Sequence, residues 1–305
     1  MEPIRSIVVI GAGQAGASAA TKLRSLGFEG ELHLIGNEPY VPYQRPPLSK
    51  KYLTGEIELE RILIKPEAFY NTANIELHLD VEAVAIEPDD NSILLSNGRR
   101  LNWDRLLLAT GSRPRELPDG VIEAGCPVHV LRNLRDVHQL APAMEAAKKA
   151  LIVGGGYIGL EAAAAARHFD VAVTLVEATD RILQRVAAEA TSKRFADLHR
   201  RHGVDIREGT GLSRVTSLGD GKYRAAFSSG DTLDIDLVLI GIGVIPNAEL
   251  ATAAGLSTNN GISVDDHGRT SNPTIFAAGD CASFDWRGTH LRLESVQNAI
   301  DQAEA

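Results

Sequence analysis

Three glycines and a glutamate in the middle of the chain have the types and spacing needed to bind a dinucleotide. Gly154, Gly156 and Gly159 form a G-x-G-x-x-G pattern directly after the apolar run at residues 150–153. In such a pattern the first glycine allows a tight turn, the second lets backbone approach a pyrophosphate, and the third lets a helix lie close to the sheet. Glu177 ends the next apolar run, where a carboxylate can bind both ribose hydroxyls. Because a 2′-phosphate would meet that negative charge, the pattern predicts NAD rather than NADP.

The N-terminal region contains the same pattern a second time. Gly11, Gly13 and Gly16 follow one predicted strand and precede a predicted helix and a second strand. In this copy the acidic residue, Glu38, does not directly follow the second strand, so Asn37 and Glu38 are both candidates for the ribose contact. Two nucleotide sites in one chain indicate two cofactors, with a reaction that passes between them.

Two further positions have side chains suited to a cofactor. Arg45 and Lys50 stand on either side of a rigid Pro-Pro pair, so a stiff loop presents two cations close to the first nucleotide pattern in the chain. A proline-rich surface connection explains the same composition equally well. Asp280 follows a short apolar strand, at the end of a parallel strand where such sheets bind ligands, although an ordinary turn is the commoner reason for a Gly-Asp pair.

The elements that must position these residues repeat a single plan. Each glycine pattern belongs to a strand–helix–strand unit, and each unit is followed by short alternating strands typical of a β-meander. The run at 105–109 is apolar on both faces, which predicts a central strand of a parallel sheet. An irregular stretch is expected up to residue 291, before a helix at 294–305. The predicted strands are 6–10, 31–35, 75–79, 81–87, 91–96, 105–109, 150–153, 171–176, 222–227, 236–240 and 274–278.

This plan predicts an α/β fold with two Rossmann-like, three-layer dinucleotide-binding domains, each carrying a β-meander. The Pro- and Gly-rich segment at 112–129 is the expected crossing into the second domain, and the return is expected near 244–247. The first predicted dinucleotide-binding domain therefore comprises residues 1–113 and 247–305, and the second, which contains the predicted NAD pattern, is inserted between them at 114–246.

Composition excludes several classes of protein. The 305 residues include 31 Lys and Arg against 40 Asp and Glu, a net charge of −9 that argues against binding nucleic acid or an anionic membrane. Cys126 and Cys281 are far apart and form no C-x-x-C pattern, so neither a disulfide framework nor a redox dithiol is indicated. No signal peptide or membrane span is apparent and no metal site is predicted. The expected setting is a soluble protein of the reducing cytoplasm.

Seven segments in this order resemble a known family: GAGQAG, PYQRPPLSK, LLLATG, GGGYIGLE, GIGVIPN, IFAAGDCA and ESVQNA. They are similar to the FAD- and NADH-dependent ferredoxin reductases of bacterial oxygenase systems, relatives of rubredoxin reductase and apoptosis-inducing factor. These belong to the pyridine nucleotide-disulfide oxidoreductase superfamily but lack its redox disulfide. The resemblance runs through the whole chain. It implies FAD and NAD as cofactors and an NAD domain inserted into the FAD domain.

The resemblance also implies an activity. Hydride would pass from NADH to FAD, and single electrons would then pass to a 2Fe–2S ferredoxin, or to rubredoxin, that feeds a Rieske-type or haem-thiolate oxygenase. Family members continue for about another hundred residues, an ordinary small domain, so the C-terminal interface domain is expected to be absent from this chain. The quaternary state is expected to be a monomer or a homodimer.

Residue roles follow by resemblance alone. Lys50 and Glu161 are implied as a pair beside the reacting rings, Arg45 as a second cation beside the flavin, and Arg132 as a ligand of the FAD pyrophosphate. The other FAD-contacting positions implied are Gly11, Gly13, Ala15, Gly16, Asn37 or Glu38, Ala83, Ala109, Thr110, Asp280 and Val296. On the NAD side, the positions implied are Gly154, Gly156, Ile158, Gly159, Glu161, Glu177, Arg185 and Gly241.

Two other functions remain open. One alternative is another enzyme with the same fold: a disulfide, peroxide or CoA-disulfide reductase, or an NADH oxidase. Disulfide chemistry needs a cysteine against the flavin. Residues 42–45, where it is expected, read Pro-Tyr-Gln-Arg, so the sequence argues against that chemistry. A flavin-binding partner protein like apoptosis-inducing factor is the other alternative. The nucleic-acid-binding form of such a protein needs a basic surface, which a net charge of −9 does not provide. The arginines around residues 99–115 could form a docking face for an acidic ferredoxin, but scattered solvated side chains explain them more simply.

Overall fold

The computed structural model describes residues 3–305, and the chain divides into two compact units. The first unit comprises residues 1–44, 60–113 and 246–305, and the second comprises residues 45–59 and 114–245. Residues 45–59, which the predicted boundaries place in the first domain, thus belong to the second unit, and Pro246 belongs to the first. Each unit contains one of the two glycine patterns.

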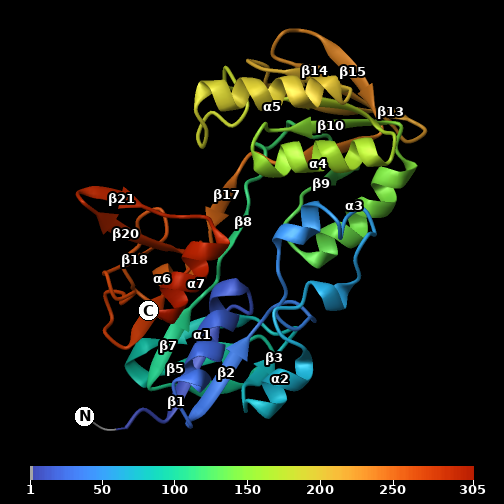
Figure 1. Cartoon of the computed structure of the whole chain (residues 1–305). Helices are drawn as coiled ribbons and strands as arrows, with labels where there is room; N and C mark the ends of the chain where they lie inside the picture. The colour runs from blue at the N-terminus through green and yellow to red at the C-terminus, as the bar shows by residue number, and fades with distance from the viewer. Residues whose placement is uncertain (1–2) are drawn as a thin grey trace. The chain divides into compact units, whose positions relative to one another are not determined.

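The first unit is built on a five-stranded parallel sheet with the order β19-β7-β1-β2-β3. β7 (Arg105–Leu108) pairs with both β1 (Ser6–Ile10) and β19 (Ile275–Ala277), which confirms the prediction of a central strand. In Figure 1, α1 (Gln14–Ser25) crosses in front of this sheet.

Alternate residues of β1 explain why this unit has three layers. Ile7 and Val9 pack with Ala15 and Ala20 of α1 in one core, whereas Val8 and Ile10 pack with the antiparallel meander β4-β5-β6 in another. Side chains of a strand point alternately to opposite faces, so an uninterrupted apolar strand must be covered on both sides. The helices α1 and α7 (Val296–Glu304) cover one face, and the meander covers the other.

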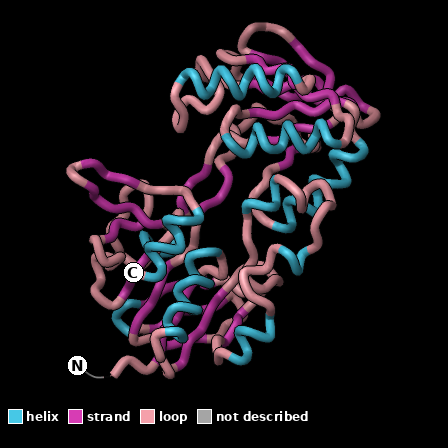
Figure 2. Tube along the Cα trace, viewed as in Figure 1, coloured by secondary structure: helices cyan, strands magenta, loops and turns pink. Residues whose placement is uncertain are grey.

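The second unit repeats the plan. Its parallel sheet has the order β12-β11-β10-β16-β9, with α4 (Tyr157–His168) packed against β10 and β11. The meander β13-β14-β15 packs on the other face, where Phe227 and Ile235 share a core with Leu151 and Val153 of β10. Figure 2 shows the strands of each unit with their helices alongside. The duplication, the three layers and the insertion of one unit into the other are as predicted.

One predicted segment is wrong. The stretch before residue 291, expected to be irregular, forms the hairpin of β20 (Ala282–Trp286) and β21 (Thr289–Leu291). Its two-residue turn has Arg287 at φ +49° and Gly288 at φ +79°. Such a turn normally carries Asn-Gly or Asp-Gly because both residues need a positive φ, so Arg-Gly gave no recognisable signal.

The remaining predicted strands are present with ends shifted by at most two residues. No helix among residues 3–305 is long and apolar enough to cross a membrane. The other elements are β2 (Glu31–Ile35), η1 (Pro46–Ser49), η2 (Leu59–Arg61), α2 (Glu67–Thr72), β3 (Glu76–His78), β4 (Ala83–Glu87), η3 (Pro88–Asp90), β5 (Ser92–Leu95), β6 (Arg100–Asn102), β8 (Ser112–Pro114), β9 (Val128–His129), α3 (Leu134–Ala146), β10 (Lys149–Val153), β11 (Ala172–Val176), α5 (Glu189–Arg201), β12 (Val204–Arg207), β13 (Leu212–Gly219), β14 (Lys222–Phe227), β15 (Thr232–Ile235), β16 (Leu237–Ile240), β17 (Val244–Pro246), α6 (Glu249–Ala253) and β18 (Ile262–Val264).

Candidate functional site

The three glycines of the first pattern have different surroundings. A Cβ on Gly11 would lie 2.1 Å from the Ala109 carbonyl oxygen, and one on Gly16 would lie 1.9 Å from the Gly11 carbonyl oxygen. Gly11 also has a φ of +116°, which L side chains rarely adopt. A Cβ on Gly13, in contrast, would meet nothing within 4 Å. The first and third glycines are therefore required by packing, and the second leaves backbone open to a ligand.

The second pattern repeats this division of roles. A Cβ on Gly154 would lie 2.4 Å from the Gly241 carbonyl oxygen, and one on Gly159 would lie 2.0 Å from the Gly154 carbonyl oxygen. A Cβ on Gly156 would meet only the Gly241 oxygen, at 4.0 Å. Both units thus present open backbone at the middle glycine, the position expected to approach a pyrophosphate.

These open glycines also begin the two helices. Gly13 is the N-cap of α1 and Gly156 is the N-cap of α4, and neither helix start has a side-chain capping hydrogen bond. The first amides of a helix have no partner inside the helix and lie at the positive end of its dipole. The start of each helix can therefore donate hydrogen bonds to a phosphate oxygen, so the residues present suit a dinucleotide in each unit.

In the second unit Glu177 lies where the sequence predicts it, directly after β11. Its Oε2 accepts a hydrogen bond from the Gly155 amide at 2.7 Å, and its Oε1 accepts from the Thr179 amide at 2.8 Å. The carboxylate is thus fixed beside the glycine turn. Arg185 approaches the loop after β16, with Nη1 3.4 Å from the position of a Cβ on Gly243.

The exposed beginning of α4 carries the charged pair of this unit. Glu161 lies one turn beyond Ile158, and its Oε2 is 2.7 Å from the Lys50 Nζ. The buried Ser49 hydroxyl donates to the same oxygen, and Lys50 also donates to the Pro46 carbonyl at 3.1 Å. The side chains of Lys50 and Glu161 remain 48% and 28% exposed, so the pair is open to a ligand. The structure therefore brings together the two residues predicted as a pair.

The two predicted arginines of the same unit are also neighbours. Arg45 donates from Nη1 to the Arg132 carbonyl at 2.8 Å. The Asp136 carboxylate in turn accepts from the Arg132 amide at 2.7 Å, and Asp136 completes a capping box with Asn133 at the start of α3. This cap fixes the backbone that holds Arg132. Arg45, Lys50 and Arg132, all predicted to contact FAD, thus lie in the unit that contains the NAD pattern.

The predicted FAD positions of the first unit gather around Gly11 and α1. Thr110 follows Ala109 and donates to the Asn247 carbonyl at 2.6 Å. Asp280 follows β19 and accepts from the Ser112 hydroxyl at 2.9 Å. A Cβ on Gly279, directly before Asp280, would lie 3.1 Å from the Ala15 Cβ. The Asp280 backbone is therefore held against the start of α1.

The other predicted positions of this unit lie on three further elements. Asn37 is exposed after β2, whereas Glu38 is half-buried and accepts a hydrogen bond from the buried Tyr43 hydroxyl. Ala83 lies buried on the meander, beside a β-bulge of β4. Val296 is 41% exposed at the first turn of α7. Both Asn37 and Glu38 thus remain candidates for the ribose contact.

Comparisons with known proteins agree with this geometry. The family described as pyridine nucleotide-disulphide oxidoreductase matches residues 5–303. Rhodocoxin reductase of Rhodococcus erythropolis is 43% identical, over 98% of this chain and 70% of its own. A ferredoxin–NAD(P)(+) reductase of a Sphingomonas species is 42% identical, over 97% of this chain and 72% of its own. In the solved covalent complex of putidaredoxin reductase and putidaredoxin, the matching chain is 40% identical with a TM-score of 0.93, over 98% of this chain and 73% of that one.

This chain belongs to the pyridine nucleotide-disulphide oxidoreductase family. It is an oxidoreductase, and its cofactors are FAD and NAD(H), as predicted. The family resemblance of the sequence is confirmed. The individual roles of the site residues stay predictions.

Sequence reasoning missed two residues of this oxidoreductase site. Ser49 belongs to the segment PYQRPPLSK, which by itself gives the serine no role. In the structure its buried hydroxyl donates a hydrogen bond to the Glu161 carboxylate. Asn133 forms the cap that holds Arg132, and the Asn-x-x-Asp spacing before an apolar helix was the available signal.

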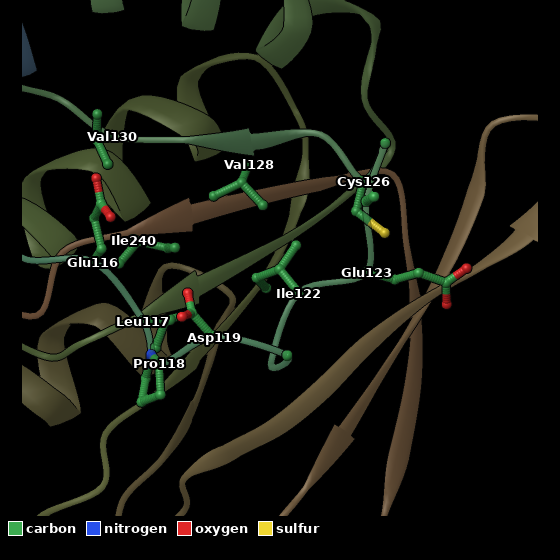
Figure 3. A pocket seen from close by; sticks show the side chains of 13 residues that line it. Glu116, Leu117, Pro118, Asp119, Ile122, Glu123, Cys126, Val128, Val130 and Ile240 are labelled. Atoms are coloured by element: carbon green, nitrogen blue, oxygen red, sulfur yellow. The ribbon is translucent and has the colours of Figure 1, made fainter.

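A separate cavity of about 420 Å³ lies in the second unit, beneath the crossing segment. Figure 3 shows the apolar side chains of Ile122, Val128 and Ile240 around it, with the carboxylates of Glu116 and Asp119 at its border. None of the predicted site residues lines it. The cavity thus lies between the loop at residues 116–126 and the core of the second unit, apart from the residues predicted to bind the nucleotides.

Proposed function

We propose that this oxidoreductase passes electrons from NADH, through bound FAD, to a 2Fe–2S ferredoxin that serves an oxygenase. The duplicated glycine turn carries this proposal. In each unit only the middle glycine leaves its backbone open, and it does so at an uncapped helix start. A chain with two such turns can bind two dinucleotides. The names of the relatives support ferredoxin as the electron acceptor, with rubredoxin as the alternative.

The proposed NADH specificity depends on Glu177. Its carboxylate is fixed by two backbone amides beside the glycine turn of the second unit. A ribose with free hydroxyls can donate to such a carboxylate, whereas a 2′-phosphate brings a second negative charge to the same place.

We assign Lys50 and Glu161 to the nicotinamide end of the site. Bound FAD supplies the chemistry that links two-electron donors to one-electron acceptors. The chain's own residues position the rings and provide fixed charge: the Lys50 ammonium is held at one place by the Pro46 carbonyl and by Glu161. A preorganised charge stabilises negative charge that develops nearby without reorganising.

Thiol chemistry has no support in this chain. Cys281 is fully buried, and its Sγ lies 3.4 Å from the carbonyl oxygens of Leu108 and Ala278. Burial raises the pKa of the Cys281 thiol and also that of Cys126, so both stay protonated near neutral pH. Neither cysteine forms a disulfide, which supports the proposal of a cytoplasmic setting.

The test is anaerobic mixing of the purified, FAD-loaded protein with NADH, followed at the flavin absorbance, and then addition of oxidised 2Fe–2S ferredoxin. We expect rapid bleaching by NADH and recovery of the absorbance as the ferredoxin is reduced. Bleaching without recovery would exclude that ferredoxin as the acceptor, and oxidised rubredoxin would then be tested in its place. An absorbance that NADH leaves unchanged would overturn the proposed reaction.

A further inference from the structure

Two histidines and a glutamate meet on one face of the first unit's sheet, on the neighbouring strands β2 and β3. His33 lies on β2, and Glu76 and His78 lie on the edge strand β3. In the parallel register His33 is opposite Glu76, and His78 is two residues further along the strand. Residues two apart on a strand point to the same face, so the pairing of β2 with β3 forces the three side chains together.

The distances within this cluster resemble those between ligands of a tetrahedral metal ion. His33 Nδ1 is 3.1 Å from His78 Nε2, His33 Nδ1 is 3.3 Å from Glu76 Oε2, and His78 Nε2 is 3.3 Å from Glu76 Oε1. Ligands about 2.0–2.1 Å from a tetrahedral ion lie roughly 3.3–3.4 Å from one another. The two imidazole nitrogens and the two carboxylate oxygens are therefore separated by about the distances between ligands of a zinc ion, and one ligand atom of each residue lies within 4.8 Å of the other two.

Burial distinguishes the cluster from ordinary surface charges. The side chains of His33 and His78 are only 10% and 4% exposed, whereas that of Glu76 is 53% exposed. Two imidazole nitrogens in contact need one ring to donate and the other to accept, so only one of the two can carry a proton at the contact. A metal ion satisfies both lone pairs at once. The exposed side at Glu76 provides an entry path and room for a water as fourth ligand.

We propose that His33, Glu76 and His78 bind a zinc ion that joins the edge strand β3 to β2. Two imidazoles and a carboxylate form a ligand set that zinc accepts with water in the fourth position. The sequence analysis predicted no metal site because these residues have no metal-binding spacing: the two histidines are separated by 45 positions. Only the parallel pairing of the strands brings them together.

Two neighbouring charges act on this site in opposite directions. Glu31 lies on the other side of the His33 ring, with Oε2 3.9 Å from Nε2, where a carboxylate orients a metal-bound histidine. Arg99 Nη2 is 3.6 Å from Glu76 Oε1 and competes with a cation for that carboxylate. Because the Arg99 side chain is 55% exposed, it can turn into solvent when the ion binds. Substitution of Arg99 therefore gives a variant whose expected effect on zinc affinity is opposite to that of removing a ligand.

The test is equilibrium dialysis of the FAD-loaded full chain with Zn²⁺, after chelator treatment, with elemental analysis of the bound metal. Glu76→Gln and His78→Gln each remove one ligand, and Arg99→Gln removes the competing cation. His290→Gln is the matched control, since His290 also contacts a carboxylate, that of Asp285 at 2.8 Å, but has no second histidine beside it. Zinc X-ray absorption then reports the number of imidazole ligands.

We expect one zinc ion per chain with two imidazole ligands. Removing a ligand should weaken binding by at least about tenfold, since changes to outer-shell partners alone cost 10- to 100-fold. Arg99→Gln should tighten binding, and His290→Gln should leave the affinity unchanged. Equal affinity in the unmodified protein and in Glu76→Gln would overturn the proposal, as would the absence of stoichiometric zinc. Glu76 is exposed, so this variant decides the question even if His78→Gln does not fold.

Discussion

At the scale of single residues, the position of Glu177 is decided by backbone amides. One carboxylate oxygen accepts a hydrogen bond from the Gly155 amide, within the glycine turn, and the other accepts from the Thr179 amide, in the loop after β11. The charge is therefore held in place before any ligand binds. Preorganisation of this kind favours specificity, because the side chain has little freedom to turn away from an unsuitable ligand.

We predict that Glu177→Arg shifts coenzyme preference toward NADPH. The arginine replaces repulsion of a 2′-phosphate by attraction, so the ratio of kcat/KM for NADH and NADPH should change by at least about tenfold, roughly 1.4 kcal/mol. Glu177→Gln, which removes the charge but keeps an acceptor for the Gly155 amide, should lie between the two. Unchanged selectivity in both variants would remove Glu177 from the ribose site.

A second prediction at this scale concerns pH. The hydrogen bonds of His290 with the Asn259 carbonyl and with Asp285 raise the pKa of His290. A group whose folded pKa is raised stabilises the fold fully below its unfolded pKa, about 6.5 for histidine, and loses that contribution as pH rises through the folded value. The protection of β20 and β21 from hydrogen exchange should therefore decrease above about pH 6.5 once corrected for intrinsic rates. His290→Gln should remove this step, and an identical profile in that variant would contradict the assignment.

At the scale of elements, the strand–turn–helix units separate the structural from the functional glycines. Gly16 faces backbone and Gly13 faces open space, although the two residues are only three positions apart. The difference arises because α1 lies directly on the turn at its third position, while its first amides point outward.

We predict that Gly13→Ala and Gly16→Ala have different consequences. Gly13→Ala should fold normally and bind FAD at least about tenfold more weakly, because the new methyl group occupies the path of the pyrophosphate. Gly16→Ala should destabilise the chain itself, because its Cβ would lie 1.9 Å from a carbonyl oxygen. Flavin content and thermal unfolding of the purified proteins separate the two effects. Normal flavin retention by Gly13→Ala would contradict the role given to the open glycine.

At the scale of the whole molecule, the duplication allows each cofactor to be assigned to its own unit. The two glycine turns have the same packing, so fold alone leaves open which nucleotide each one binds. We propose that Glu177 binds NAD(H) in the second unit and that Asp280, held beside α1, binds FAD in the first.

Hydrogen exchange tests this assignment across the chain. We predict that NAD⁺ added to the FAD-loaded protein increases protection at residues 154–177 and 241–243 but leaves 6–16 unchanged. Removal of FAD should instead reduce protection at 6–16, 109–111 and 279–280. This pattern follows because a ligand stabilises the amides of the unit that binds it. NAD⁺ protection centred on residues 6–16 would reverse the assignment.

The sequence determined the fold class and both nucleotide turns. Apolar runs of strand length, each followed by G-x-G-x-x-G, constrain the local backbone so strongly that β1, β2 and β14 begin and end where predicted. Signals of this kind act between neighbours in the chain. For the same reason the Arg287-Gly288 hairpin was missed, since its turn residues lack the usual local signal.

The tertiary structure alone decided which distant residues meet. Lys50 and Glu161 are separated by 111 positions, and only the packing of residues 45–59 with the second unit brings them within 2.7 Å. His33 and His78 meet because β3 pairs in parallel with β2 at one register. Strand order, register and the packing of loops depend on contacts between parts of the chain that no local pattern encodes, so these sites become visible only once the chain has folded.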